Sequence, residues 1–273
     1  MRDRGLLFSI MSLMLVLSVF TLAAYYSTIH VGEEIQSEKM NNIFSDVQTD
    51  IEQVLAMNAE VVHDGGRTMV RMNDRMPLED GVSTLNAYED HLEGYYAGKI
   101  NSDIRFFRGS EPEMSIEPVG MVYGYNTYNK QELRVYNETG EARVYAYELY
   151  FRVDGNFVNA QDETLSGSRR VKINGTFANT GYEEMFTVSP TESSTVTLNF
   201  TTGKVRIHLG RNTIKGVERD NSIRITMLGD IGGEIGANIV FDDMADVGVK
   251  TNMSLEVSGP ITRRDNVWLT PPV

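Results

Sequence analysis

Residues 5–32 form an uninterrupted stretch without a charged side chain. The apolar core of this stretch is about as long as the roughly 20 residues that a membrane-spanning helix requires. The flanking charges differ, because Arg2 and Arg4 precede the stretch whereas Glu33 and Glu34 follow it. The positive-inside tendency places the N-terminal end in the cytoplasm and the rest of the chain outside. The pattern therefore predicts a single-pass membrane helix.

A cleaved secretory signal peptide is the alternative interpretation of this stretch. The apolar region of such a peptide usually has about 7–15 residues, which is shorter than the stretch seen here. Residues 21–24 are mostly small and provide a candidate cleavage site. The length favours a retained segment.

The apolar stretch continues into a segment with helical periodicity. Residues 33–64 contain neither Gly nor Pro, and Gly65 and Gly66 follow. Apolar residues recur every three or four positions, which is typical of the seam of an amphipathic helix. The seam consists of Met40, Phe44, Val47, Ile51 and Val54. We predict a helix over residues 6–63, either continuous or hinged at Gly32.

The period of the pattern changes further along the chain. A second helical pattern begins after Pro77 and extends to about Gly98. From about residue 104 the alternation has a period of two, which indicates strands. The clearest runs are 132–136 and 142–153, and the turn-forming residues between them predict a hairpin. Further strands are expected at 169–178, 195–201, 203–209, 221–227, 235–241 and 251–258.

These elements predict an α+β protein. A long N-terminal transmembrane and amphipathic helix is followed by a mainly antiparallel, β-sandwich-like extracytoplasmic domain. A polar run at 155–168 leaves open whether this domain has two sub-sheets. The expected organisation is a leader at 1–5, the helix at 6–63, a linker with a short helix at 64–103 and the β-rich domain at 104–273.

Composition excludes several classes of function. The formal net charge is −13, and nucleic-acid binding relies largely on Lys and Arg, so a nucleic-acid partner is not expected. The chain has no cysteine, which excludes disulfides, thiolate metal sites and cysteine nucleophiles.

Residues for catalysis are scarce. The four histidines, His30, His63, His91 and His208, show no spacing typical of a zinc site, and there is no Gly-x-Ser-x-Gly elbow. We therefore expect no enzyme activity, no cofactor and no metal centre. The acidic segments 154–162 and 242–246 leave calcium binding open, although solvated turns explain them better.

Tyrosines and Asn-x-Ser/Thr sequons are the remaining candidates for a surface function. Seven tyrosines lie between residues 123 and 150, and they suggest either a sugar- or peptide-binding platform or, as we favour, ordinary strand packing. Four sequons follow the apolar stretch and are candidate N-glycosylation sites: Asn137, Asn174, Asn199 and Asn252.

The N-terminal residues resemble those of archaeal type IV pilin-like proteins. Arg4-Gly5 precedes Leu6-Leu7-Phe8-Ser9-Ile10-Met11, and the resemblance covers roughly residues 3–60. It implies that a membrane peptidase cuts after Gly5, that Leu6 becomes the new N-terminus, and that the apolar helices pack as a filament core with the heads outside. Many pilins carry a glutamate as the fifth residue of the processed chain, whereas this chain has Ile10.

Two main functions follow. The first is a pilin-like surface subunit, in which Ser9 and Ser12 permit close helix approach and the 40–54 seam contacts another chain. The seam's alternative partner is the β-rich head of the same chain. The second function is a single-pass, signal-anchored binding or adhesion module that does not polymerise. A surface-anchored hydrolase is a third and weaker interpretation.

The expected partners are the membrane, copies of the chain or other pilin-like surface proteins. The expected location is the cell membrane or an extracellular filament.

Overall fold

The computed structural model divides into two compact units, residues 1–46 and residues 47–273. In the first unit the described residues 21–22 and 38–46 are helical. No helix within the described parts of the chain is long and apolar enough to span a membrane, and the predicted span at 5–32 lies almost wholly outside them. The structure describes residues 21–22, 38–55, 57–76, 81–109, 111–125, 131–139, 143–163, 166–242, 246–258 and 262–272.

The second unit begins with helical residues 47–55, whose apolar side packs into the unit. Val47, Ile51 and Leu55 recur every four residues and are almost completely buried. The Gln48 side chain donates from Nε2 to the Leu269 carbonyl over 3.1 Å. This end of the helix is therefore an integral part of the β-rich unit.

Two strands follow where the sequence pattern predicts more helix. Strands β1 (Met57–Asp64) and β2 (Arg67–Met76) pair antiparallel along their whole length. Gly65 and Gly66 form the turn, with φ of 57° and 80° that suit glycine. The prediction of helix up to residue 63 is thus wrong for residues 57–63. The glycine pair that resembled a helix stop is the turn of a hairpin.

The helix predicted after Pro77 is present and extends slightly further than expected. It comprises α2 (Gly81–Asp90), the π-helical turn η1 (His91–Tyr96) and α3 (Ala97–Ile100). It ends at Asn101, whose left-handed conformation (φ 51°) is typical of a helix end.

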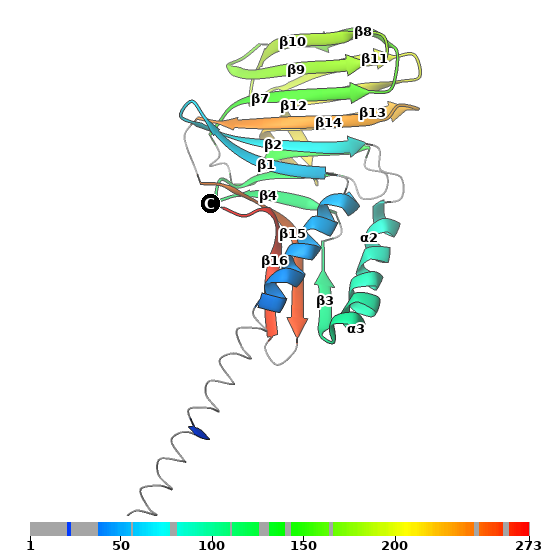
Figure 1. Ribbon diagram of the computed structural model, residues 1–273. Helices are drawn as coiled ribbons and strands as arrows, with labels where there is room; N and C mark the ends of the chain where they lie inside the picture. Colours follow the sequence, from blue (N-terminus) through cyan, green and yellow to red (C-terminus); the bar gives the residue numbers. More distant parts are fainter. Residues whose placement is uncertain are drawn as a thin grey trace, which may run out of the picture. The chain divides into compact units, whose positions relative to one another are not determined.

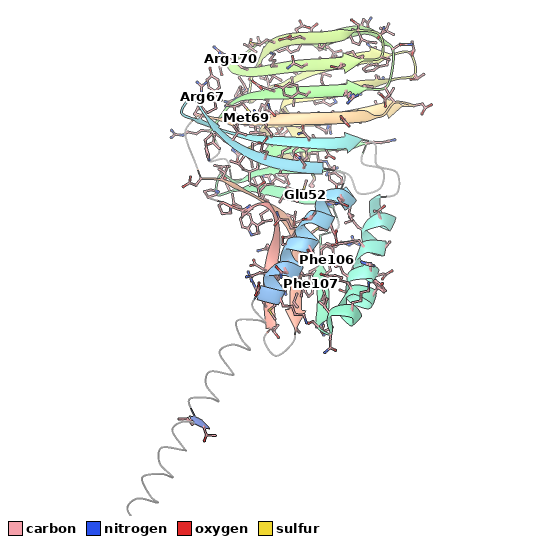
Figure 2. The ribbon with its side chains drawn as sticks, viewed as in Figure 1. Glu52, Arg67, Met69, Phe106, Phe107 and Arg170 are labelled. Carbon is pink, nitrogen blue, oxygen red and sulfur yellow. The ribbon has the colours of Figure 1, made fainter. Side chains whose placement is uncertain are left out.

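Strand β3 (Asp103–Phe107) packs beside this helical run (Figures 1 and 2). The Phe106 ring meets the Tyr88 ring edge-on at 6.0 Å between centroids. The Phe106 backbone N–H also donates to Glu93 Oε1 over 2.8 Å. Tyr88 donates in turn to Asp50 Oδ2 over 3.2 Å, which joins the helical run to residues 47–55.

The strands form two sheets, which lie one layer over the other in Figure 1. The six-stranded sheet has the order β1-β2-β14-β7-β9-β10, antiparallel except for the parallel β7–β9 pair. The ten-stranded sheet has the order β16-β15-β4-β5-β6-β13-β12-β11-β8, with β3 also paired to β15. The strands not yet delimited are β4 (Glu113–Glu117), β5 (Met121–Tyr125), β6 (Glu132–Asn137), β7 (Val144–Val153), β8 (Phe157–Glu163), β9 (Arg169–Phe177), β10 (Gly181–Val188), β11 (Ser193–Phe200), β12 (Gly203–Ile214), β13 (Val217–Gly229), β14 (Gly233–Phe241), β15 (Gly248–Ser258) and β16 (Thr262–Thr270).

Alternating apolar side chains from both sheets fill the space between the layers. Leu149 and Phe151 of β7 and Ile207 and Leu209 of β12 are almost completely buried. Each such side chain stabilises the fold by roughly 1.5–3 kcal/mol. The predicted α+β class with a sandwich-like, largely antiparallel β region is therefore confirmed.

Two buried tyrosines form hydrogen bonds between the sheets. Tyr147 of β7 donates to the Asn221 carbonyl of β13 over 2.8 Å. Tyr123 of β5 donates to Asp74 Oδ2 of β2 over 3.3 Å. Burial raises the pKa of both phenols above the usual range, and the nearby Asp74 charge raises that of Tyr123 further.

The predicted strands are found, but the predicted hairpin is not. Strand β6 belongs to the ten-stranded sheet, where it pairs with β5 and β13. Strand β7 belongs to the six-stranded sheet, where it pairs with β14 and β9. The polar residues between β6 and β7 therefore connect two layers. Alternation identifies the face that a residue occupies, but not the strand beside it.

Candidate functional site

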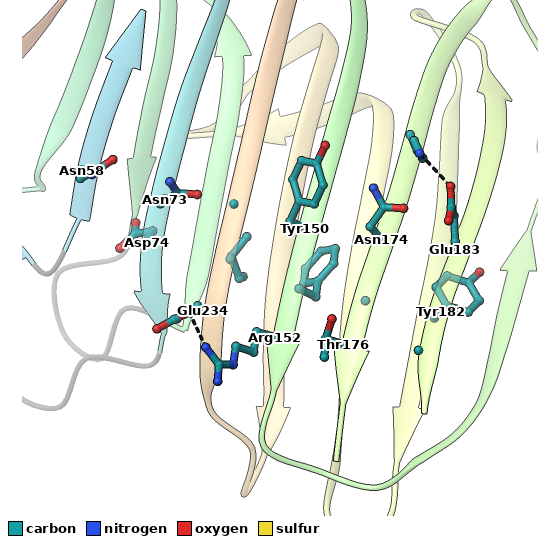
Figure 3. A pocket seen from close by; sticks show the side chains of 16 residues that line it. Asn58, Asn73, Asp74, Tyr150, Arg152, Asn174, Thr176, Tyr182, Glu183 and Glu234 are labelled. Carbon is teal, nitrogen blue, oxygen red and sulfur yellow. Dashed lines mark ion pairs between the residues drawn. The ribbon is translucent and has the colours of Figure 1, made fainter. Parts of the chain in front are cut away.

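The outer face of the six-stranded sheet carries a hollow with a volume of about 1090 Å³ (Figure 3). Its centre is one row of residues that the strand register aligns across the sheet. We call this row and the hollow above it the trough. From β1 to β10 the row consists of Asn58, Asn73, Gly236, Tyr150, Asn174 and Glu183.

Gly236 forms the floor of the trough. A Cβ atom at this position would lie 2.8 Å from Asn73 Oδ1 and 3.3 Å from Tyr150 Cβ. The side chains of Asn73 and Tyr150 thus lie close to this position, and a larger residue here would force at least one of them to move. Glycine inside a strand often marks a place where another group approaches the backbone.

The Tyr150 ring forms one wall of the trough and is 39% exposed. Its phenol donates to Glu148 Oε2 over 2.9 Å. Burial, followed by the bond to Glu148, raises the pKa of Tyr150 to about 12. The phenol is therefore neutral at physiological pH.

The charged residues of the trough form pairs of opposite sign. Lys172 Nζ lies 2.7 Å from Glu183 Oε1, and Arg152 Nη1 lies 3.8 Å from Glu234 Oε2. The hydrogen bond with Glu183 raises the pKa of Lys172 above its usual value. These four charges cancel among the described side chains on the open surface of the trough.

Asp74 is the one buried carboxylate that borders the trough. It lies on the inner face of β2, next to Asn73, and is only 3% exposed. Burial, followed by the charge of Asp74, raises the pKa of Tyr125 as well as that of Tyr123. Asp74 thus lies among phenols that stay protonated, and we assign it a structural role.

The tyrosines that suggested a binding platform mostly belong to the core. Tyr123, Tyr125, Tyr136 and Tyr147 are at most 4% exposed. Within the described part of that cluster, Tyr150 is the exposed member.

Tyr145 is half-buried and lies near two arginines, Arg67 of β2 and Arg170 of β9, which Figure 2 labels. The Arg67 guanidinium carbon lies 3.7 Å from its ring centroid, and that of Arg170 lies at 5.6 Å. Arg170 Nη1 also donates to the Tyr145 phenol over 3.0 Å. The face of this ring is already occupied.

The predicted self-association residues fall into two groups. Gly5, Leu6, Ser9 and Ser12, which include the candidate processing site, lie outside the described residues. In the seam, Met40, Val47 and Ile51 are buried, whereas Phe44 and Val54 are half-buried.

The four sequon asparagines differ in their surroundings. Asn252 Nδ2 donates to the Glu111 carbonyl over 2.7 Å, and its Oδ1 accepts from the Glu113 N–H. Asn199 Nδ2 donates to Asn159 Oδ1 over 2.8 Å. Asn137 is half-buried at the end of β6, and Asn174 lies in the trough.

Groups suited to metal binding are not found in the described parts of the chain. Nowhere there do three or more His, Cys, Asp or Glu side chains converge in an arrangement that would hold a metal ion. His208 instead shares a hydrogen bond with Thr195 Oγ1 over 3.1 Å. Burial, then the charges of Arg224 and Arg206, lowers its pKa.

Searches with the whole chain found no matching protein-family model, no similar curated protein and no similar solved structure. Function must therefore be inferred from the chain itself.

Sequence reasoning missed most of the trough. Asn58 and Asn73 fell in segments assigned to a helix and a linker. Two signals were present, namely the alternation that sets Tyr150 on one face of its strand and a glycine within a strand pattern. Neither identifies which strands are neighbours.

Proposed function

We propose that this chain is a pilin-like surface subunit that assembles through its N-terminal apolar segment and presents its β-rich unit outside the cell. In this role it acts without catalysis, and its partners are the membrane and copies of itself or related surface proteins. The proposal combines the Arg4-Gly5 boundary and the uncharged stretch 5–32 with the helix that follows them.

One observation carries the proposal, namely that helical residues 47–55 pack within the β-rich unit. Val47 and Ile51 are buried there, and Gln48 hydrogen-bonds with the backbone of β16. A segment held in a membrane or a filament core would thus be joined to the β-rich unit through a packed helix. In this conformation Val47 and Ile51 are covered within the chain, so the contacts between copies are assigned to the apolar segment.

The state of the N-terminus tests the proposal directly. Mass spectrometry of the membrane and shed surface fractions should show a chain that begins at Leu6. Gly5→Phe should block this processing, whereas the control Gly32→Ala should not. A chain that retains residues 1–5 would contradict the proposal, and so would one that begins near Tyr25.

The absence of cysteine permits a clean test of assembly. Ser9→Cys should give disulfide-linked dimers in the surface fraction, because neighbouring apolar helices would lie in contact. Val217→Cys, at an exposed turn of the β-rich unit (Val217 is 49% exposed), is the matched control and should give few. Equal yields from both variants would argue against assembly through the apolar segment.

The second candidate is a single-pass, signal-anchored binding module that does not polymerise. The trough favours it, because a binding module needs an accessible and chemically defined surface. Retained residues 1–5 together with a lack of Ser9→Cys dimers would select this alternative.

A further inference from the structure

We infer that the trough is a binding site for a neutral oligosaccharide. This inference is independent of whether the chain polymerises, because it depends only on side chains of the β-rich unit. All residues of the trough belong to that unit.

The hydrogen-bonding groups of the trough suit a ligand with many hydroxyl groups. Asn58, Asn73 and Asn174 lie in one row, and each side-chain amide offers both donors and an acceptor. Asn58 and Asn73 are exposed, and Asn174 is half-buried. A hydroxyl group can both donate and accept a hydrogen bond, so it matches such a row better than a group that can only donate or only accept.

The Tyr150 ring adds an apolar wall to this polar row. It is exposed at the edge of the Gly236 floor, so a flat ligand can rest on the floor with one face against the ring. A sugar ring has both a C–H-rich face and a rim of hydroxyl groups. The trough offers a surface for each.

The balance of charge disfavours charged ligands. Among the described side chains that line the trough, the cations Lys172 and Arg152 each face a carboxylate, so neither is left unpaired for a phosphate or an acidic polymer. The same pairs occupy the carboxylates that a cation would need. A neutral ligand therefore fits best.

The position of the trough also argues against a peptide strand. Strands β14, β7 and β9 are interior strands with a hydrogen-bonded neighbour on both sides. Peptides that add to a sheet need an open edge. The trough instead runs across the strands, and six strands at about 4.8 Å spacing give it a length of about 24 Å. That length accommodates several sugar units.

We assign the oligosaccharide to an external source rather than to a glycan attached to Asn174. This asparagine starts a sequon, but its side chain is half-buried in the middle of β9, directly opposite Tyr150 in the register. Glycosylated sequons usually lie on surface loops.

The test uses the full-length protein in a detergent without a sugar headgroup, since an alkyl glycoside would compete for the site. Cellotetraose, maltotetraose, chitotetraose and mannotetraose are titrated by calorimetry, with a tetragalacturonate as the anionic comparison. We expect saturable binding of at least one neutral probe and none of the anion. Lack of binding by every neutral probe, or preference for the anion, would overturn the inference.

Variants then locate the binding site. Tyr150→Ala should weaken binding about tenfold through loss of the ring contact. Gly236→Asn should abolish it, because the new side chain fills the floor. Tyr95→Ala removes a tyrosine that is 58% exposed on η1, outside the trough, and should leave binding unchanged.

The thermal midpoint of each variant shows whether it is folded. If Gly236→Asn does not fold, Tyr150→Ala still decides the outcome. Binding that survives Tyr150→Ala undiminished would refute the assignment. A glycan found on Asn174 by peptide mass spectrometry would do so too, since it would occupy the trough.

Discussion

The two faces of the six-stranded sheet are formed by the same strands, but one face packs in the core and the other carries the trough. On β7, Tyr150 borders the trough while the next residue, Phe151, is 2% exposed in the core. On β14, Gly236 lines the trough while Ile235 is fully buried. Successive residues of a strand point to opposite faces, so stability and binding are separated by a single position in the sequence.

The largest expected effect comes from the inner face. Phe151→Ala removes a buried ring and leaves a cavity, which should lower the free energy of unfolding by about 3–5 kcal/mol. Tyr150→Ala, one residue away, should lower it by no more than about 1 kcal/mol, because its ring and hydrogen bond are partly exposed. Denaturant titration of the full-length protein measures both. Equal losses would mean that the outer face also carries the fold.

The next effect concerns the hydrogen bond between the sheets. Tyr123→Phe removes the O–H that donates to Asp74 Oδ2 in the core, and it should lower the stability by about 1–3 kcal/mol. Tyr182→Phe, the control, removes an exposed bond to Glu184 and should change stability by about 0.5 kcal/mol or less. If both variants lose the same free energy of unfolding, the buried hydrogen bond from Tyr123 to Asp74 contributes no more to stability than the exposed one.

The effect of Tyr123→Phe should also depend on pH. The pKa of Tyr123 is raised in the folded protein above its usual value near 10. The stability that its proton contributes is therefore complete below pH 10 and is lost as the pH rises from there towards the folded pKa. The difference in stability between the wild-type protein and Tyr123→Phe should thus shrink above pH 10. A constant difference at alkaline pH would contradict the burial of this phenol.

The smallest expected effect is on the rim of the trough. Lys172→Met breaks the pair with Glu183, whose side chain is 69% exposed. Such surface pairs contribute about 0–1 kcal/mol, so the thermal midpoint should barely move. A large loss of stability would show that this exposed ion pair on the outer face contributes substantially to the stability of the fold.

The sequence predicted which residues alternate, but not which strands become neighbours. The α+β class, the helix after Pro77 and β7 follow from local periodicity, which burial of one face imposes. The 132–153 hairpin was wrong because its two strands entered different layers. Residues 57–63 were assigned to a helix because the segment up to Asp64 contains neither Gly nor Pro, and because Val61 and Val62 continue its series of apolar residues.

The trough was beyond prediction for the same reason. Its row joins Asn73, Gly236 and Tyr150 only through the register of β2, β14 and β7. Those strands are widely separated in the chain. Periodicity predicted an amphipathic helix over residues 40–54. In the β-rich unit, however, the buried residues of this helix are Val47, Ile51 and Leu55, whereas Val54 is half-buried.

The place of β14 between β2 and β7 has a consequence for how the protein matures. Met69 of β2 pairs with Val240 of β14, so the centre of the sheet is formed by two strands that are far apart in the sequence. Long-range pairing of this kind makes folding slow. Until β14 has paired with β2 and β7, the backbone N–H and C=O groups along one edge of each of these strands can pair with strands of other molecules. During this period a nascent chain is open to aggregation through strand pairing, and the trough is completed only after β14, which ends at Phe241, has been synthesised.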